Sequence, residues 1–293
     1  MINLKYYVST IVAIFLAIGI GIFIGIMLDG QDLIVQQQEQ LVKQLESKFD
    51  EFKTKQDELQ SKMDIVNLEK EKNIKFFETI YPDLLKNKLK GLNVMIVETN
   101  EQYPYSGLKD AFEKAGCENV TKVFVKKEML LNDNELMLKI AKELNLEGST
   151  KEELGEKIIQ AFSSAILTEE NATFLEKLKE HGMIDYEEIS KQPIDYIVIA
   201  GGNVDKNKVV FNQIEVPLIQ YIKNNKTPIV AVEQLKSDIS NIEEYKKLRV
   251  PTVDNVDTII GKVSMLMVVS GRQGDFGEKE TAERLLPKGF VQE

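Results

Sequence analysis

The feature that most constrains this chain is an uncharged run of twenty-three residues, from Tyr6 to Leu28. About twenty consecutive apolar residues are enough to cross a bilayer as a helix. A cleaved signal peptide is the alternative, but its apolar region is shorter and normally ends at a cleavage site of small residues. Met27-Leu28-Asp29 offers no such site. The run therefore predicts an uncleaved, single-pass transmembrane anchor over residues 6–28.

The charges that flank this run predict its orientation. Lys5 and the amino terminus precede it, whereas Asp29 and Asp32 follow it. Positive charge close to a span favours the cytoplasmic side. We therefore expect residues 1–5 to form a cytoplasmic tail in the cell membrane, and the rest of the chain to be extracytoplasmic.

Small residues recur every fourth position within the predicted span. Ala13, Ala17, Gly21 and Gly25 would share one helix face, and the last two form a GxxxG pair. Such a face lets a second membrane helix approach closely, which predicts self-association. The alternative interpretation is that Gly and Ala are simply common in membrane helices.

Residues 31–80 contain no Gly and no Pro and are rich in Gln, Glu and Lys. Placing heptad position a at Val35 and d at Gln38 makes ten of fourteen a and d positions apolar through Ile80. This pattern predicts a coiled-coil stalk and a homo-oligomer. The central seam residues are Leu45, Phe49, Phe52, Leu59, Met63 and Val66. A single helix that folds back on the globular part is the alternative.

Beyond Pro82 the heptads give way to short apolar runs that alternate with helical stretches. Strands are predicted at 92–97, 120–125, 195–200 and 228–232, and helices at 107–115, 133–181 with interruptions, 212–224 and 256–270. Alternation of apolar strands with helices predicts an open, mainly parallel sheet covered on both faces. The fold class is therefore α/β, with an α/β domain over 83–271 and a C-terminal tail over 272–293.

Paired glycines follow the strand at 195–200, so Gly201, Gly202 and Asn203 mark the predicted ligand pocket. Loops after strand ends are where open α/β sheets bind ligands. A tight turn alone would also explain the glycines. No catalytic motif and no nucleophile–base pair can be identified, so we predict no catalytic residues and no enzymatic activity.

Metal-binding residues are scarce. Cys117 and His181 are the sole residues of their types, and a terminal helical position suggests a capping role for His181. Met265 and Met267 fit core packing. The acidic residues Asp254, Asp257, Asp275 and Glu278 lack a metal-ligand spacing, and helix capping also accounts for Asp254. No cofactor is evident, and the metal site is unknown.

Charge argues against nucleic acid as a partner. The chain carries 47 acidic and 37 basic residues, a net charge of −10. Nucleic-acid-binding proteins present a basic patch or stripe to the phosphates. We therefore expect no nucleic-acid partner. The expected partners are the membrane, further copies of this chain and an envelope protein.

Several of these segments together carry a resemblance to a known family. The span VSTIVAIFLAIGIGIFIGIML, the coiled coil, a strand ending in AGG, VDNVDTIIGKVSML and GRQGDFG resemble the mycobacterial copper transport protein B family, MctB. The resemblance implies an envelope protein in copper homeostasis or transport. Members of similar layout resemble corynebacterial cell-separation factors, which implies an alternative role as a tether that regulates a cell-wall hydrolase. The resemblance implies copper as a ligand, but it carries over no copper-binding residues.

Overall fold

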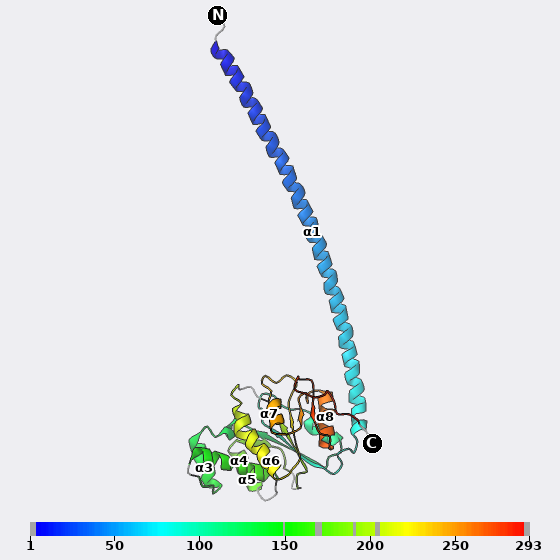
Figure 1. The fold of residues 1–293 in the computed structure, drawn as a ribbon, viewed down its shortest axis with the longest axis vertical. Helices are drawn as coiled ribbons and strands as arrows, with labels where there is room; N and C mark the ends of the chain where they lie inside the picture. Colours follow the sequence, from blue (N-terminus) through cyan, green and yellow to red (C-terminus); the bar gives the residue numbers. More distant parts are fainter. Residues whose placement is uncertain (1–3, 149, 168–171, 190–191, 203–205, 290–293) are drawn as a thin grey trace. The chain divides into compact units, whose positions relative to one another are not determined.

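The computed structural model describes residues 4–148, 150–167, 172–189, 192–202 and 206–289. The chain divides into two compact units, with the boundary between Lys72 and Asn73. Helix α1 (Leu4–Leu85) forms the first unit and contributes its last turns to the second. All seven strands and the remaining helices belong to the second unit (Figure 1).

The N-terminal part of α1 is apolar on all sides. Leu4–Met27 has a mean hydropathy of 2.7, and no part of it is buried within the chain. A helix that is apolar all round requires an apolar surrounding, either a protein core or a membrane. Its length and composition are compatible with the single-pass anchor expected from the sequence.

Helix α1 continues past the expected end of the stalk. The stalk was predicted over residues 31–80, whereas the helix runs through Pro82 to Leu85. A proline lacks one backbone donor, which costs a single hydrogen bond within the last turn. Tyr81 and Leu85, four residues apart on one helix face, are buried in the core of the second unit and stabilise this turn.

One seven-stranded sheet forms the centre of the second unit, in the order β3-β2-β1-β4-β5-β6-β7. All neighbouring strands are parallel except β3, which pairs antiparallel with β2. The strands are β1 (Asn93–Glu98), β2 (Asn119–Val125), β3 (Ile184–Tyr186), β4 (Tyr196–Ala200), β5 (Ile229–Val232), β6 (Thr252–Val253) and β7 (Asp275–Phe276). The predicted α/β class and the open, mainly parallel sheet are therefore confirmed.

Helices cover both faces of the sheet, which explains why the central strands are continuous apolar runs. One face packs against α3 (Asn134–Glu143), α4 (Lys151–Leu167), α5 (Ala172–Glu180), α6 (Val216–Asn224) and α7 (Ile242–Lys247). The other packs against α2 (Leu108–Lys114), α8 (Ile259–Val269) and the end of α1. Figure 1 shows α3, α4, α5 and α6 gathered together, in green to yellow.

The last crossover differs from those before it. The steps from β4 through β7 all run in one direction across the sheet. Helices α6 and α7 lie on one face along this path, whereas α8 lies on the opposite face. The β6–α8–β7 crossover therefore has the opposite hand to the two preceding ones. About 98% of parallel crossovers are right-handed. A prediction from this rule alone would place α8 on the face of the sheet that α6 and α7 cover.

The segment expected as a C-terminal tail contributes to the sheet instead. Asp275–Phe276 forms strand β7, and the backbone N–H of Gly277 donates to the carbonyl of Arg284 over 2.9 Å. Phe276 is buried in the core. The glycines of GRQGDFG suggested a turn, but Phe276 buries enough apolar surface to hold the two-residue strand in place.

Candidate functional site

The carboxyl ends of β1 and β4 lie side by side in the middle of the sheet. The backbone N–H of Thr99 donates to the carbonyl of Ala200 over 3.0 Å, extending the ladder between them. From β1 the chain continues to β2 on one side, and from β4 it continues to β5 on the other. Open α/β sheets bind ligands at such a switch point, because the connections diverge there and leave a crevice.

A crevice of about 200 Å³ opens at this switch point. Its apolar wall comes from Val125 at the end of β2 and from Val210 and Ile214 near the start of α6. Ile214 belongs to a π-helix, Phe211–Glu215, which directly precedes α6. π-helical turns are rare in proteins, and many of those that occur lie at functional sites. The polar lining consists of Thr99, Asn100, Glu101, Gln102, Lys126 and Lys127.

The buried side chain of Asn100 ties the two loops at the crevice together. Its Nδ2 donates to the carbonyl of Gly202 over 2.7 Å, and its Oδ1 accepts from the backbone N–H of Gln102 over 2.9 Å. The loop after β1 is therefore fixed both internally and against the loop after β4. A polar lining held in this way needs little reorganisation when a ligand binds.

The three predicted pocket residues have different positions. Gly202 lines the crevice and has a φ of 102°, a conformation that favours glycine. Gly201 lies behind it, where a β-carbon would come within 2.1 Å of the Tyr245 hydroxyl. The absence of a side chain at Gly201 is therefore required by packing. Asn203 lies outside the described residues.

Behind the crevice is a fully buried carboxyl group, Glu215, at the end of the π-helix. The Tyr245 hydroxyl donates to its Oε2 over 2.5 Å, and the Thr99 hydroxyl donates to its Oε1. Burial raises the pKa of Glu215 to about 7, although the two hydroxyl donors oppose this shift. Because Thr99 also lines the crevice, this carboxyl group joins the crevice wall to the core.

A second buried carboxylate, Glu233, follows β5. The ammonium of Lys279 lies 2.7 Å from its Oε2, and the hydroxyl of Ser240 donates to the same oxygen over 2.8 Å. Glu98 at the end of β1 is also buried, and Lys122 Nζ lies 2.8 Å from its Oε1. Glu233 and Glu98 thus each have a cationic partner, as buried charges require.

The site residues that were not predicted from the sequence are Thr99, Asn100, Lys126, Lys127 and Glu215. A signal was available for the first four, because they directly follow the predicted strands at 92–97 and 120–125. The carboxyl ends of parallel strands meet at one edge of the sheet, so polar residues there are brought together. Glu215 gave no such signal, since it is one polar residue inside an apolar helical segment.

The soft donors that copper prefers are not gathered together. Cys117 is half-buried, and burial raises the pKa of its thiol to about 12. His181 follows the C-terminal end of α5, as expected, and its Nε2 lies 2.8 Å from Glu143 Oε2. Met265 and Met267 are buried in the core, which confirms their packing role. Among the described residues, no three His, Cys, Asp or Glu side chains form a metal-binding group.

The four acidic residues near the C-terminus have separate partners. Asp254 accepts from the backbone N–H groups of Glu278 and Lys279, over 2.8 and 3.0 Å, so helix capping was the wrong explanation for it. Thr258 caps α8 instead. Asp257 accepts from the backbone of Leu235, and Asp275 accepts from the Thr252 hydroxyl. The side chain of Glu278 accepts from Nδ2 of Asn255 over 3.0 Å.

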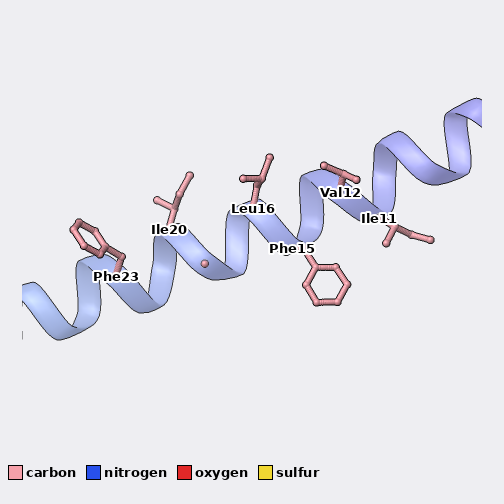
Figure 2. Close-up of a pocket in the computed structure, with 7 residues that line it drawn as sticks. Ile11, Val12, Phe15, Leu16, Ile20 and Phe23 are labelled. Carbon is pink, nitrogen blue, oxygen red and sulfur yellow. The ribbon is translucent and has the colours of Figure 1, made fainter.

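The residues expected to mediate self-association all lie on the first unit's part of α1. Ile11, Val12, Phe15, Leu16, Ile20 and Phe23 project outward from the apolar part of the helix (Figure 2). The small residues Ala13, Ala17, Gly21 and Gly25 recur on another face of the same helix. The predicted seam is exposed throughout its central part. Its exposed members are Leu45, Phe49, Phe52, Leu59, Met63 and Val66, each at least 61% exposed.

Comparison with known families gives one match, over residues 1–287, to the model described as "Copper transport outer membrane protein, MctB". The chain belongs to the MctB family. The match confirms the family resemblance over almost the whole chain, and with it a copper-transport-related membrane protein of the cell envelope. The apolar start of α1 is compatible with a single-pass anchor in such a protein. The comparison with curated proteins gives no match.

Proposed function

We propose that this protein is a self-associating, membrane-anchored scaffold that supports copper transport in the cell envelope. In this proposal residues 6–28 cross the cell membrane, residues 1–5 lie in the cytoplasm, and residues 31–80 form a coiled coil. The second unit is the extracytoplasmic head, which binds an envelope partner. The role is structural, and the head performs no catalysis.

The observation that carries this proposal is the exposed apolar seam on α1. Leu45, Phe49 and Phe52 are 67–71% exposed in the single chain. Contiguous apolar surface of this extent marks an interaction site on a soluble protein. From Val35 to Val66 the seam is about 47 Å long at 1.5 Å per residue. A helix of this length needs a partner along its apolar stripe, since tertiary packing supplies most helical stability.

The anchor makes a second copy of this chain a suitable partner for the seam. Chains that cross the same membrane in the same direction present their stalks parallel and at the same height. Identical seams then meet in register, and each a or d side chain can insert between residues of the neighbouring helix. The stripe of Ala13, Ala17, Gly21 and Gly25 supports close packing within the membrane.

Copper enters this proposal as the family's cargo, and the scaffold contributes to its transport by assembly. The half-buried thiol, the core methionines and the paired His181 do not form a Cu(I) site within one described chain. We expect the purified full-length protein in detergent to remove no stoichiometric Cu(I) from a chromogenic chelator. Stoichiometric removal would contradict the structural role and support direct copper binding.

Sedimentation of the full-length protein in detergent tests the scaffold. We expect an oligomer that Leu59→Asn weakens by about tenfold or more in dissociation constant, because the oligomer would bury the seam side chain that Asn replaces. Leu68→Asn is the matched control, since Leu68 occupies the outward f position of the same heptads and is 52% exposed. A monomeric wild type, or equal effects of the two substitutions, would contradict the proposal.

Partner identity distinguishes the two envelope roles. Cross-linking in intact cells, followed by purification of the full-length protein, should recover a component of copper transport in contact with the head. Recovery of a cell-wall hydrolase complex in its place would support the alternative role, a tether that regulates cell separation.

A further inference from the structure

The crevice at the switch point carries an excess of positive charge. Lys126 and Lys127 both line it, and Glu101 is the one carboxylate of the lining. The oxygen Oε1 of Glu101 accepts from the backbone N–H of Lys127 over 2.9 Å, so this carboxylate is engaged in fixing the turn after β2. The lining residues therefore sum to a charge of about +1 at neutral pH.

The two ammonium groups have no counter-ion within the described part of the chain. Among the described residues, neither Lys126 nor Lys127 forms an ion pair with a carboxylate oxygen within 4.0 Å. Asp185 is the carboxylate that Lys126 influences, lowering its pKa, but Asp185 itself pairs with Lys179 over 3.3 Å. Elsewhere in the head, the lysines that stand beside buried carboxylates are paired, as Lys122 and Lys279 are.

The volume of the crevice restricts what can occupy it. About 200 Å³ lies below the 300–1,000 Å³ typical of sites for drug-sized ligands. A dinucleotide is too large, whereas a small oxyanion fits. Asn100 is fixed by two hydrogen bonds and retains one further N–H for a ligand. The apolar wall of Val125, Val210 and Ile214 would exclude water from one side of a bound anion, which strengthens its ion pairs.

We propose that this crevice is a binding site for a small oxyanion, a carboxylate or phosphate group held by the ammonium groups of Lys126 and Lys127. Asn100 donates to the same group from the loop after β1. The occupant is a free small molecule, because the crevice is too small for more than one such group. This site is independent of the scaffold role, since it involves no residue of the stalk or of the membrane span.

Phosphate binding to the full-length protein tests this site. In a detergent without phosphate groups, the 31P resonance of inorganic phosphate should broaden and saturate at millimolar concentrations. Replacing both lysines, Lys126→Gln with Lys127→Gln, should weaken binding by about tenfold or more, because charge-assisted hydrogen bonds are lost. Lys90→Gln is the matched control, since Lys90 is exposed and precedes β1 at the opposite end of the strand.

Two further experiments distinguish a preformed binding site from non-specific attraction of anions to lysine. Gln102→Trp should block binding by volume without a change in charge, and Gln102 is exposed, so the substitution should be tolerated. Acetate, which carries a single carboxylate, should compete with phosphate, and the neutral acetamide should not. Failure of wild-type protein to bind saturably, or unchanged binding by the double lysine variant, would overturn the proposal.

Discussion

The hydroxyl of Tyr245 lies 2.5 Å from Oε2 of Glu215, in a buried contact that joins α7 to the π-helix before α6. The same carboxyl group accepts from Thr99, which follows β1. Three elements that are far apart in sequence are therefore connected through one side chain. Because Thr99 lines the crevice, its hydrogen bond to Glu215 fixes the position of one part of the crevice wall.

Tyr245→Phe should destabilise the head by about 1–3 kcal/mol. The substitution keeps the ring in the core but removes the donor, so a buried carboxyl oxygen loses its hydrogen bond. It should also raise the pKa of Glu215 further, since this hydrogen bond lowers it in the wild type. Urea unfolding followed by the near-ultraviolet signal of the tyrosines measures the loss. A change below the experimental error would contradict the importance of this contact.

Glu215→Gln should change how stability depends on pH. Burial raises the pKa of Glu215 to about 7 from 4.5, so the folded head retains a proton that the unfolded chain releases. The contribution of this proton to the free energy of unfolding is fully present below pH 4.5 and is lost as pH rises through 7. The wild type should therefore lose roughly 3 kcal/mol relative to Glu215→Gln between pH 4.5 and pH 8.

Unfolding in urea at a series of pH values checks this difference. Glu98 and Asp254, whose pKa values burial also raises, are common to both proteins and cancel in the comparison. Parallel pH profiles of the two proteins would contradict the assignment of a raised pKa to Glu215.

Gly201→Ala should destabilise the head through a steric conflict with the Tyr245 hydroxyl. An added β-carbon would lie 2.1 Å from that oxygen, which forces the ring or the strand end to move. The same substitution should be less harmful when Tyr245→Phe has already removed the hydroxyl. A double-mutant cycle on urea unfolding measures this coupling, expected at about 0.5–3 kcal/mol. Purely additive effects would show that Gly201 has another role.

Much of the fold could be predicted from apolar patterns alone. The runs at 92–97 and 195–200 correspond to β1 and β4, and the helix expected at 256–270 corresponds to α8. Most side chains of these elements are buried, so their apolar patterns are strong. Strands β6 and β7 have only two residues each, too few for a period, and they are stabilised by pairing with distant segments.

The candidate site was predicted only in part, for a physical reason. Gly201 and Gly202 predicted the end of β4 correctly, because close packing at the first and a positive φ at the second both require glycine. The other site residues lie at or just after the ends of β1 and β2 and on the π-helix, and two of the three separations along the chain exceed about 80 residues. Only the strand order, which no local pattern encodes, brings Thr99 beside Ala200.

Labelling of an introduced cysteine tests the orientation of the protein. Glu187→Cys in a Cys117→Ser background places one thiol on a side chain that is 91% exposed. A membrane-impermeant maleimide should label it in intact cells with access to the cell membrane. The Cys117→Ser parent should remain unlabelled. Labelling that requires lysis would place the head in the cytoplasm and would contradict both envelope roles.

Disulfide cross-linking along the stalk tests most directly the claim that copies of this chain cover its apolar seam. In a Cys117→Ser background, single cysteines at Phe52, Leu59 and Val66 should form cross-linked dimers under mild oxidation in native membranes. Cysteines at the outward positions Thr54, Ser61 and Leu68 should not, because their β-carbons would be too far apart in a parallel pair. A seven-residue period of cross-linking is the predicted result, and equal or absent cross-linking at both sets would contradict the scaffold.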